Sequence, residues 1–518
     1  MRGRDRLLLG AVAGASASAV MMFLRVLSPT PSVAEYVQDF IVQLLPGEVF
    51  AFMLERVGFI GRPLLFASIV LGHILVGAGL GSLFTRLRPV RQIGPGTVIS
   101  EIVGLAFGLW LVVGLVVLPL LGGGAFGQNR TTDGLPVSLV LLVVVSAYAI
   151  VLVGLYRSIT QPVGADLIDD ATRRQLLTGL GTATVVAAVA GFASRQTVTS
   201  SSVAAGPDRP PTTATTTPPP AEFAGVSPEI TPVGRFYTVS KNFIDPQVSA
   251  DGWTLRIAGQ VDQEHEYTYE QLQAMPLTSM PATLCCISNE VGGDLIGNGV
   301  WKGVPLRDLI EAAGPRNGVV KVAFQCRDDY TDSITFDTAM NDGALLALEM
   351  NGETLAPQHG YPARLVVPGI YGMKNVKWVE TITLLETDFL GFWQEQGWND
   401  AAPYQTMSRI DTTSRSQDWV RGTTVNVGGI AFAGNRGIDA LEISLDGGIT
   451  WQRANLKPPL GQNSWVLWAI PWKVDGDRAT IQARAIDGTG EPQTAEVNPP
   501  FPDGSTGLHT ITIRVADA

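Results

Sequence analysis

Two of the chain's three cysteines are adjacent, Cys285 and Cys286, and the third is Cys326. Adjacent cysteines are poor partners for each other, because a disulfide needs its two Cα atoms farther apart than neighbouring residues comfortably sit. Three thiols without a Cys-x-x-Cys spacing also support neither a disulfide framework nor a zinc site. Two interpretations stay open: small buried side chains in a core, or one thiolate that ligates a softer metal.

A loop rich in small residues, 369–378, carries Lys374 and Lys377 three positions apart. It follows the apolar run 363–367, which is typical of a buried strand and is ended by Pro-Gly. Small residues let the backbone approach a ligand closely, and two ammonium groups suit a phosphate or another anion. Two solvated lysines remain the alternative interpretation.

Short β patterns and helical patterns alternate from 232 to 405 and would position these groups. The runs 253–259 and 319–326 predict strands. Thr268 caps a predicted helix that reaches residue 275, and 305–313 predicts a second short helix, closed by a glycine. The prediction is an α+β catalytic domain.

From about Thr423 the pattern is all β, with turns at regular spacing. The run Asp446-Gly447-Gly448 is a strong hairpin signal. An immunoglobulin-like sandwich is the simplest closure for such a segment, so we expect a separate domain over 406–518.

Charge divides the chain into two parts. Residues 1–200 hold 14 arginines, no lysine and 10 acidic residues, whereas the remainder holds 22 basic and 37 acidic residues. The basic, very apolar first part predicts a transmembrane anchor over 1–195, and the acidic remainder predicts a soluble part. Nothing in an acidic domain could neutralise phosphates along a duplex, which argues against nucleic-acid binding.

Five apolar runs approach or exceed the roughly 20 residues that cross a bilayer. They lie at 7–27, 63–84, 98–121, 135–155 and 176–193. The segment 36–57 is apolar but carries Asp39, Glu48 and Glu55, which favours an interfacial or re-entrant helix over a sixth span.

Three arginine clusters, 2–6, 86–91 and 157–174, indicate the orientation. With five spans all three fall on the cytoplasmic side, and the rest of the chain lies on the extracytoplasmic side. The pair Arg173-Arg174 before an Ala- and Gly-rich run resembles a twin-arginine export signal, with ordinary positive-inside anchoring as the alternative. The Thr- and Pro-rich segment 196–231 predicts an extended linker.

Taken in order, these segments resemble the sulfite oxidase family of molybdopterin enzymes over residues 232–518. The resemblance rests on Phe236-Tyr237, Asn242, 283–286, 345–353, 359–362 and 364–378. It implies a molybdenum–molybdopterin cofactor, a sulfite-oxidase-type α+β domain and an immunoglobulin-like dimerisation domain. A metal held by the pterin dithiolene and one protein thiolate keeps positions free for oxygen-atom transfer.

The resemblance also implies roles for individual residues. The family's ligand cysteine stands three residues before an asparagine, here Asn289, which makes Cys286 the metal ligand and Cys285 a bystander. Tyr330 matches the family's active-site tyrosine, and Arg436 matches an arginine that reaches the substrate pocket from the C-terminal domain. The expected cofactor contacts are Asn242, Cys286, Asn289, His359, Arg364, Lys374 and Lys377.

Two departures from the family bear on the substrate. Sulfite oxidases follow that asparagine with arginines, whereas this chain has Glu290 and Val291, and they place an arginine before an Asn-His pair where this chain has Ser240-Lys241-Asn242. A sulfite dianion needs concentrated positive donors. Reduction of an S- or N-oxide therefore competes with oxidation of sulfite.

We thus expect a membrane-anchored oxidoreductase, facing outward, that acts on a small oxo substrate. The sequence contains no haem motif, flavin fingerprint or cysteine cluster, so electrons would pass through a separate carrier, a cytochrome or a quinone-linked protein, and a homodimer is compatible with the resemblance. A binding or scaffold protein that keeps the fold without the metal is the alternative. The joint presence of Cys286, Tyr330 and Arg364 argues against it.

Overall fold

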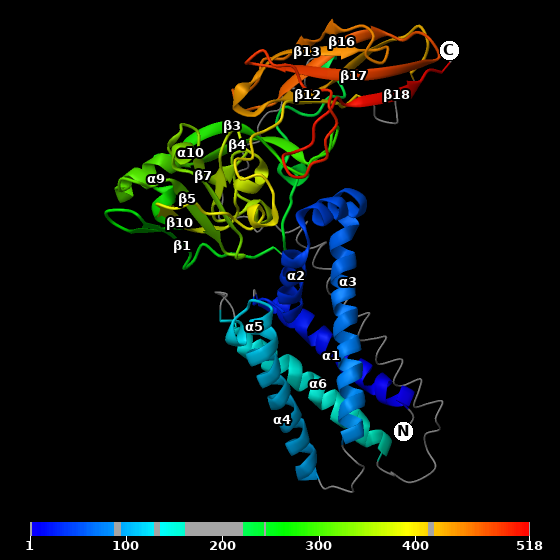
Figure 1. Cartoon of the computed structure of the whole chain (residues 1–518), viewed down its shortest axis with the longest axis vertical. Helices are drawn as coiled ribbons and strands as arrows, with labels where there is room; N and C mark the ends of the chain where they lie inside the picture. Colours follow the sequence, from blue (N-terminus) through cyan, green and yellow to red (C-terminus); the bar gives the residue numbers. More distant parts are fainter. Residues whose placement is uncertain are drawn as a thin grey trace. The chain divides into compact units, whose positions relative to one another are not determined.

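The chain forms two compact units in a computed structural model (Figure 1). The model describes residues 3–28, 30–87, 95–128, 135–160, 221–242, 245–412 and 419–516. Of these, a helical unit comprises 3–45, 57–160 and 241–242, and a β-rich unit comprises the others.

The helical unit is built from long apolar helices. They are α1 (Gly3–Leu27), α2 (Val33–Leu44), α3 (Gly47–Leu87), α4 (Pro95–Val112), the π-helical η1 (Val113–Val117), α5 (Leu118–Leu120), η2 (Ala125–Gly127) and α6 (Val137–Thr160). By length and composition four stretches could cross a bilayer: Gly3–Arg25, Leu64–Leu87, Val98–Leu120 and Val137–Arg157. They coincide with four of the five predicted segments, and the fifth, 176–193, lies outside the described residues together with the arginine pair before it.

Small residues bring α1 and α3 together. A Cβ atom on Gly10 would lie 2.4 Å from the carbonyl oxygen of Gly77. The hydroxyl of Tyr148, on α6, donates a hydrogen bond of 2.7 Å to that same carbonyl. Close backbone approach at small residues is the usual way in which helices associate without a hydrophobic driving force.

The segment 36–57 differs from the prediction of one interfacial or re-entrant helix. Helix α2 ends at Leu44, and α3 begins at Gly47 and continues without a break to Leu87. Pro46 separates the two helices because a proline cannot donate the backbone hydrogen bond that a helix interior requires.

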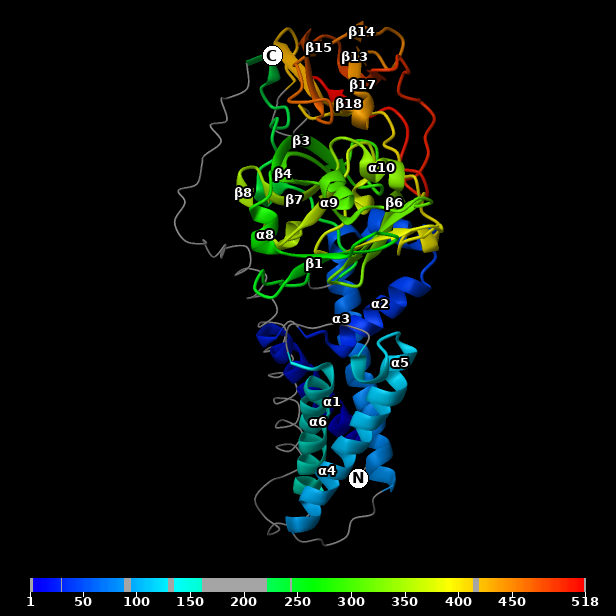
Figure 2. The ribbon, with the colours of Figure 1, turned by 90° about the vertical axis from the view of Figure 1, so that its left-hand side faces the viewer.

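The catalytic part of the β-rich unit has two sheets, with strand orders β2-β1-β10-β5-β6 and β3-β4-β7-β8, and β9 added to β7. The second sheet can be followed in Figure 2. The strands are β1 (Thr254–Gly259), β2 (His265–Thr268), β3 (Thr278–Cys285), β4 (Ile296–Pro305), β5 (Lys321–Cys326), β6 (Thr331–Thr335), β7 (Leu345–Met350), β8 (Glu353–Thr354), β9 (Arg364–Val366) and β10 (Val379–Leu385). The helices are α8 (Tyr269–Gln273), α9 (Leu306–Ala313), α10 (Phe336–Met340), and the 3-10 turns η3 (Ala221–Phe223), η4 (Val233–Arg235), η5 (Pro357–His359), η6 (Gly372–Lys374) and η7 (Gln394–Gln396).

Local sequence signals explain several of these elements. Thr268 caps α8, since its hydroxyl accepts from the Gln271 amide while the Gln271 side chain accepts from the Thr268 amide. Helix α9 ends at Gly314, in the left-handed conformation that glycine adopts easily. The predicted strands at 253–259, 319–326 and 363–367 are β1, β5 and β9.

The C-terminal part is a two-sheet all-β domain, as predicted. Its strand orders are β11-β12-β16-β15 and β14-β13-β17-β18. The elements are β11 (Met407–Ile410), β12 (Thr424–Phe432), η8 (Gly434–Arg436), β13 (Ile438–Ser444), β14 (Gln452–Arg453), β15 (Asn455–Leu456), β16 (Val466–Lys473), β17 (Arg478–Asp487) and β18 (Thr510–Arg514). Trp468, Leu441 and Ile481 are fully buried in its core. The Asp446-Gly447-Gly448 run lies in the turn between β13 and β14.

The chain before the catalytic domain also packs on the β-rich unit. Phe223 is buried in one cluster with Cys285, Tyr371 and Tyr404. The last residues of the predicted linker, from 221 to 231, therefore belong to the packed structure.

Gly303 is required where β4 meets β7. A Cβ atom there would lie 2.0 Å from the carbonyl oxygen of Leu346. We expect Gly303→Ala to lower the free energy of unfolding by about 3 kcal/mol, because the backbone of β7 would have to move. Thermal unfolding of the detergent-solubilised chain measures the loss. Gly299→Ala, in the same strand, is the control: its nearest atom would be Asn351 Oδ1 at 3.3 Å, and equal losses would contradict the explanation.

Candidate functional site

Cys286 begins a tight turn between β3 and β4, which we call the Cys286 turn (residues 286–295). The Cys286 amide donates to the Leu295 carbonyl at 2.9 Å, and the Asn289 amide donates back to the Cys286 carbonyl at 3.0 Å. The Asn289 side-chain oxygen accepts from the Leu295 amide at 2.8 Å. These bonds close the turn, so Asn289 has a structural role in holding the cysteine.

The two adjacent thiols have different surroundings. Cys286 Sγ lies 2.9 Å from the Ser288 hydroxyl, whereas Cys285 packs in an apolar cluster with Ile287 and Tyr371. Burial raises the pKa of both thiols; hydrogen bonds from Ser288 oppose that rise at Cys286, and the Arg409 charge and a hydrogen bond with Asn289 oppose it at Cys285. A thiol that coordinates a metal ion loses its proton. The assignment of Cys286 as the ligand stays a prediction.

Arg364 is a buried cation without a carboxylate partner among the described residues. Its guanidinium lies over the Trp301 ring, 4.9 Å from the centroid, and donates to the carbonyls of His359 at 3.1 Å and Asn375 at 3.0 Å. Within the part of the chain that the structure describes, its buried Nε has no hydrogen-bond partner. Burial lowers the pKa of Arg364 to about 10. A desolvated guanidinium with an unused donor is a strong site for an anion.

His359 and Lys377 lie next to this guanidinium. The backbones of Arg364 and Lys377 pair in a β-bridge. His359 Nε2 lies 3.0 Å from the Val233 carbonyl, so this nitrogen carries the proton. Burial, reinforced by the charges of Arg364 and Lys377, lowers the pKa of His359 to about 4. The imidazole is therefore neutral at pH 7, and Arg364 and Lys377 supply the positive charge.

Three tyrosines surround the cysteines. The Cys285 amide donates to the Tyr404 hydroxyl at 3.3 Å, and the Tyr404 and Tyr371 rings are 4.9 Å apart. The Tyr237 hydroxyl and the Cys285 carbonyl both lie against Gly372, where a Cβ atom would approach them to 2.5 and 3.0 Å. Burial raises the pKa of Tyr237, the nearby thiols add to the rise, and Arg364 opposes it. The Tyr237 hydroxyl therefore lies by the Cys285 backbone, where the thiols and Arg364 act on its pKa in opposite directions.

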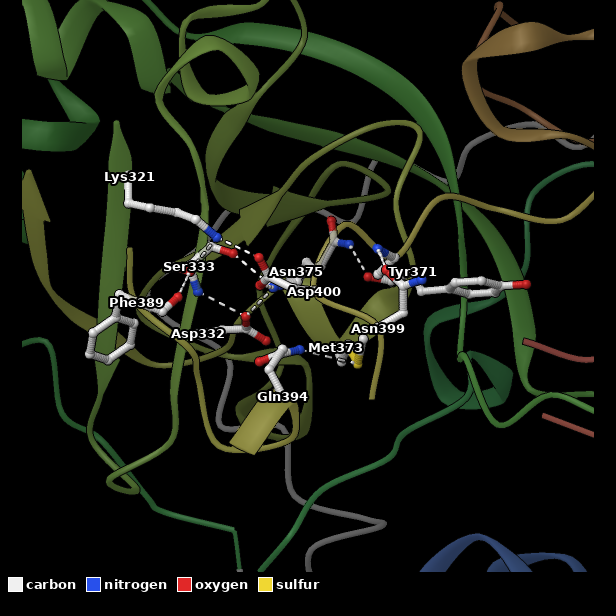
Figure 3. Close-up of polar contacts among 12 residues, drawn as sticks. Lys321, Asp332, Ser333, Tyr371, Met373, Asn375, Phe389, Gln394, Asn399 and Asp400 are labelled. Carbon is white, nitrogen blue, oxygen red and sulfur yellow. Dashed lines mark hydrogen bonds and ion pairs between the residues drawn. The ribbon is translucent and has the colours of Figure 1, made fainter. Parts of the chain in front are cut away.

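Lys374 belongs to a buried ion network, whose other members Lys321, Asp332 and Asp400 are labelled in Figure 3. Its Nζ lies 2.7 Å from Asp332 Oδ1, 2.8 Å from Asp400 Oδ1 and 2.9 Å from the Ser333 carbonyl. Lys321 pairs with Asp400 at 2.5 Å on the other side of the network. An ammonium has three donors, and all three are used here. The cofactor contact expected of Lys374 stays a prediction.

Tyr330 belongs to the same network. Its hydroxyl lies 2.9 Å from Asp332 Oδ2 and 3.1 Å from the Met373 carbonyl. Burial and the Asp332 carboxylate raise its pKa well above the ordinary value. The hydroxyl is thus directed at these two groups rather than at Cys286.

Arg436 and Asn242 were also predicted to lie in the site. Arg436 Nε pairs with Asp487 at 2.8 Å, and its Nη2 donates to the Tyr404 carbonyl at 3.1 Å. The side chain is 28% exposed, and its Nη1 makes no hydrogen bond within the described residues. Asn242 groups with the helical unit, where its side-chain oxygen accepts from Lys241 at 3.3 Å.

Comparisons with known proteins identify both parts of the β-rich unit. Residues 242–393 match the oxidoreductase molybdopterin binding domain, and 405–498 match the Mo-co oxidoreductase dimerisation domain. A sulfite oxidase of Arabidopsis thaliana is 29% identical over 52% of this chain and 84% of that protein. An inducible nitrate reductase (NADH) of Glycine max is 27% identical over 47% of this chain and 34% of that protein. The mitochondrial sulfite oxidase of Homo sapiens is 28% identical over 50% of this chain and 56% of that protein.

The chain thus spans about a third to just over half of the length of the last two relatives. Among solved structures, the sulfane dehydrogenase SoxCD from Paracoccus pantotrophus superposes with a TM-score of 0.50 and 24% identity, over 57% of this chain and 83% of that chain. This likeness supports the fold.

The Lys374–Asp332 pair gives a test of the buried network. Burial raises the pKa of the Asp332 carboxyl, and the Lys374 ammonium opposes that rise. Lys374→Met should lower the free energy of unfolding by about 3–5 kcal/mol, since it leaves an unpaired buried carboxyl. That carboxyl would be protonated in the fold but ionised in the unfolded chain, so the loss should grow by up to about 1.4 kcal/mol per pH unit as the pH rises.

Urea unfolding at pH 5 and pH 7 measures this trend. Lys302→Met is the matched control, because it removes a half-exposed ion pair with Glu349 at 3.1 Å. We expect the control to cost less than about 1 kcal/mol at either pH. A Lys374→Met loss that does not change with pH would contradict the assignment.

Proposed function

This chain belongs to the sulfite oxidase family of molybdopterin-dependent oxidoreductases, and on that premise we propose that it catalyses oxygen-atom transfer on a small oxo substrate. The observations that carry the proposal are a buried thiol, Cys286, and a buried guanidinium, Arg364, that has no carboxylate partner in the described residues. The first suits a soft metal and the second suits a phosphate.

The described residues fit the molybdenum–molybdopterin cofactor. Cys286 would ligate the metal, while Arg364 and Lys377 would bind the anionic end of the pterin. When bound, the cofactor supplies the two-electron chemistry and the oxygen transfer. The protein binds, orients and shields the reacting groups.

His359 and Arg364 would orient the cofactor in complementary ways. The Nε2–H group of His359 is held by the Val233 carbonyl, which leaves the other ring nitrogen as an acceptor for a donor on the pterin. The Arg364 fork is fixed by the two carbonyls that it already binds, so its Nε points in one direction only. Binding to such a preorganised donor loses little side-chain entropy.

Arg436 is the proposed substrate-binding cation. Its Nη1 is the donor that the described residues leave unused, and its other nitrogens fix the guanidinium against Asp487 and Tyr404. Tyr330, the predicted substrate tyrosine, directs its one proton at Asp332 or the Met373 carbonyl, so it would have to give up that bond to donate to a ligand. We therefore propose Tyr237 as the tyrosine beside the metal.

The charge around the Cys286 turn favours a neutral or weakly charged substrate. Glu290 is exposed and adds a negative charge to the turn, where the family has positive ones. A dianion is repelled by such a group, whereas an S- or N-oxide offers only a dipolar oxygen. Reduction of an S- or N-oxide is thus the leading assignment, with sulfite oxidation as the second.

We also propose that the apolar helices anchor the enzyme in a membrane with its catalytic domain on the extracytoplasmic side. The arginine clusters at the ends of the four apolar helices support a cytoplasmic N-terminus, and the fifth predicted span, 176–193, would bring the catalytic domain to the extracytoplasmic side. The arginine pair at 173–174 would direct export of the folded, cofactor-loaded domain. A separate cytochrome or quinone-linked carrier would exchange electrons with the site, and the match of 405–498 to a dimerisation domain supports a homodimer.

Molybdenum content tests the proposal directly. We expect the purified chain, made in a host with intact cofactor synthesis, to hold close to one equivalent of molybdenum. Cys286→Ala should lose most of the metal and all activity, because only this thiol is placed as a ligand. Cys285→Ala, the matched control at the adjacent position, should keep both. Less than about a tenth of an equivalent in the parent, in such a host, would favour the scaffold alternative.

A substrate screen with an artificial redox dye tests the direction of the reaction. We expect dye oxidation with a sulfoxide or an N-oxide and little dye reduction with sulfite. Arg436→Gln should raise KM more than it lowers kcat, because it removes a substrate contact. Activity with sulfite alone would overturn the leading assignment in favour of the second.

A further inference from the structure

The Cys286 turn is bound from its outer side by the C-terminal domain. We propose that Arg409, Ser505 and His509 of that domain are positioning residues for the Cys286 thiol. The proposal rests on the function proposed above, since it gives these residues a part in holding the metal ligand. It makes the C-terminal domain a component of the site in addition to its match to a dimerisation domain.

Two hydrogen bonds fix carbonyls of the turn from outside. Arg409 Nη1 donates to the Gly293 carbonyl at 2.9 Å, and the Ser505 hydroxyl donates to the Asn289 carbonyl at 2.6 Å. The bonds internal to the turn join Asn289 to Cys286 and Gly293 to Glu290. The Ser505 contact therefore acts on Asn289, which is hydrogen-bonded to Cys286 itself. The Arg409 contact acts on Gly293, which is hydrogen-bonded to Glu290 in the same turn.

The Arg409 guanidinium is itself held in one orientation. Its Nε pairs with Asp411 Oδ1 at 2.6 Å, and its Nη2 donates to the Ser227 hydroxyl at 2.9 Å. The Ser227 amide in turn donates to Asp411 Oδ2 at 3.0 Å. The side chains of Arg409 and Asp411 are 12% and 9% exposed, so the pair is shielded from water. A rigid fork of this kind can fix the position of Gly293, which a flexible lysine could not do.

His509 fills the space beside the turn. A Cβ atom on Gly292 would lie 2.4 Å from His509 Nε2, so the ring packs directly on the glycine backbone. The Ile410 amide donates to His509 Nδ1 at 2.9 Å, which fixes the ring and requires this nitrogen to be unprotonated. Gly292 has a φ of +79°, a conformation that suits glycine. The ring and the glycine together prevent the turn from moving toward the C-terminal domain.

These contacts have a chemical consequence at the thiol. Metal ligands act well when neighbouring groups hold them in one orientation. In this chain the positions of Asn289 and Gly293 depend on side chains that lie more than a hundred residues away in the sequence. Loss of these contacts would leave Cys286 held only by the internal hydrogen bonds of its own turn.

The test uses the full chain made without the cofactor, so that thiol reactivity is measured before any metal binds. Each cysteine is followed by mass spectrometry during alkylation in native conditions. Arg409→Ala should label at Cys286 about tenfold faster than the parent, because one charge-assisted hydrogen bond no longer opposes local opening. Cys326, in strand β5, is the internal control and should label at the parental rate. Arg484→Ala, which removes an arginine paired with Glu442 in the same domain, is the matched control.

Ser505→Ala is the second variant, needed if Arg409→Ala does not fold. It removes one hydroxyl and should also accelerate labelling at Cys286 and leave Cys326 unchanged. In the cofactor-loaded protein, the thiolate-to-metal absorption band should shift in both variants and not in Arg484→Ala. Unchanged labelling of Cys286 in both variants, or equal acceleration at Cys326, would overturn the proposal. Because labelling is read without cofactor, a parent chain that binds no molybdenum would defeat the proposed function and leave this result independent of it.

Discussion

The site depends on one constraint: a guanidinium, that of Arg364, is buried with no carboxylate partner among the described residues. Arg364 joins three parts of the catalytic domain: it stacks on Trp301 of β4, binds the carbonyl of His359 and binds the carbonyl of Asn375. Carbonyl dipoles compensate only part of the cost of removing its charge from water, and none of the described residues accepts a hydrogen bond from Nε. The fold therefore gains from an anion at this position, and the phosphate of a pterin cofactor would supply one.

Lys374 shows the opposite solution to the same problem. It is equally buried, but Asp332 and Asp400 neutralise it and the Ser333 carbonyl takes its third proton. The charge of Lys374 is thus compensated by carboxylates, whereas the described residues offer no carboxylate to Arg364. Arg364 and Lys374 are both buried cations, so charge and burial alone do not distinguish them. The presence or absence of a carboxylate within ion-pair distance does.

The contrast between Arg364 and Lys374 also shows which parts of the structure could be predicted from the sequence. Local signals located β1, α8, α9, β5 and the all-β C-terminal domain, because capping residues, alternation and turn residues act over a few positions. The spacing of Lys374 and Lys377 carried no information about Asp332, which is 42 residues away. The partners of the Cys286 turn could not be predicted either. Arg409 and Ser505 reach it across 116 and 216 residues, and no local pattern encodes such a distance.

The adjacent cysteines remain the centre of the molecule's chemistry. Cys285 packs in an apolar cluster. Cys286 begins a turn that is closed by its own hydrogen bonds and also bound by Arg409 of the C-terminal domain. The most direct measurement is the number of sulfur atoms around molybdenum, from X-ray absorption of the loaded enzyme. Three are expected in the parent and in Cys285→Ala, two from the pterin dithiolene and one from Cys286. Two sulfur atoms in the parent, or the loss of one in Cys285→Ala, would contradict the assignment of Cys286 as the ligand.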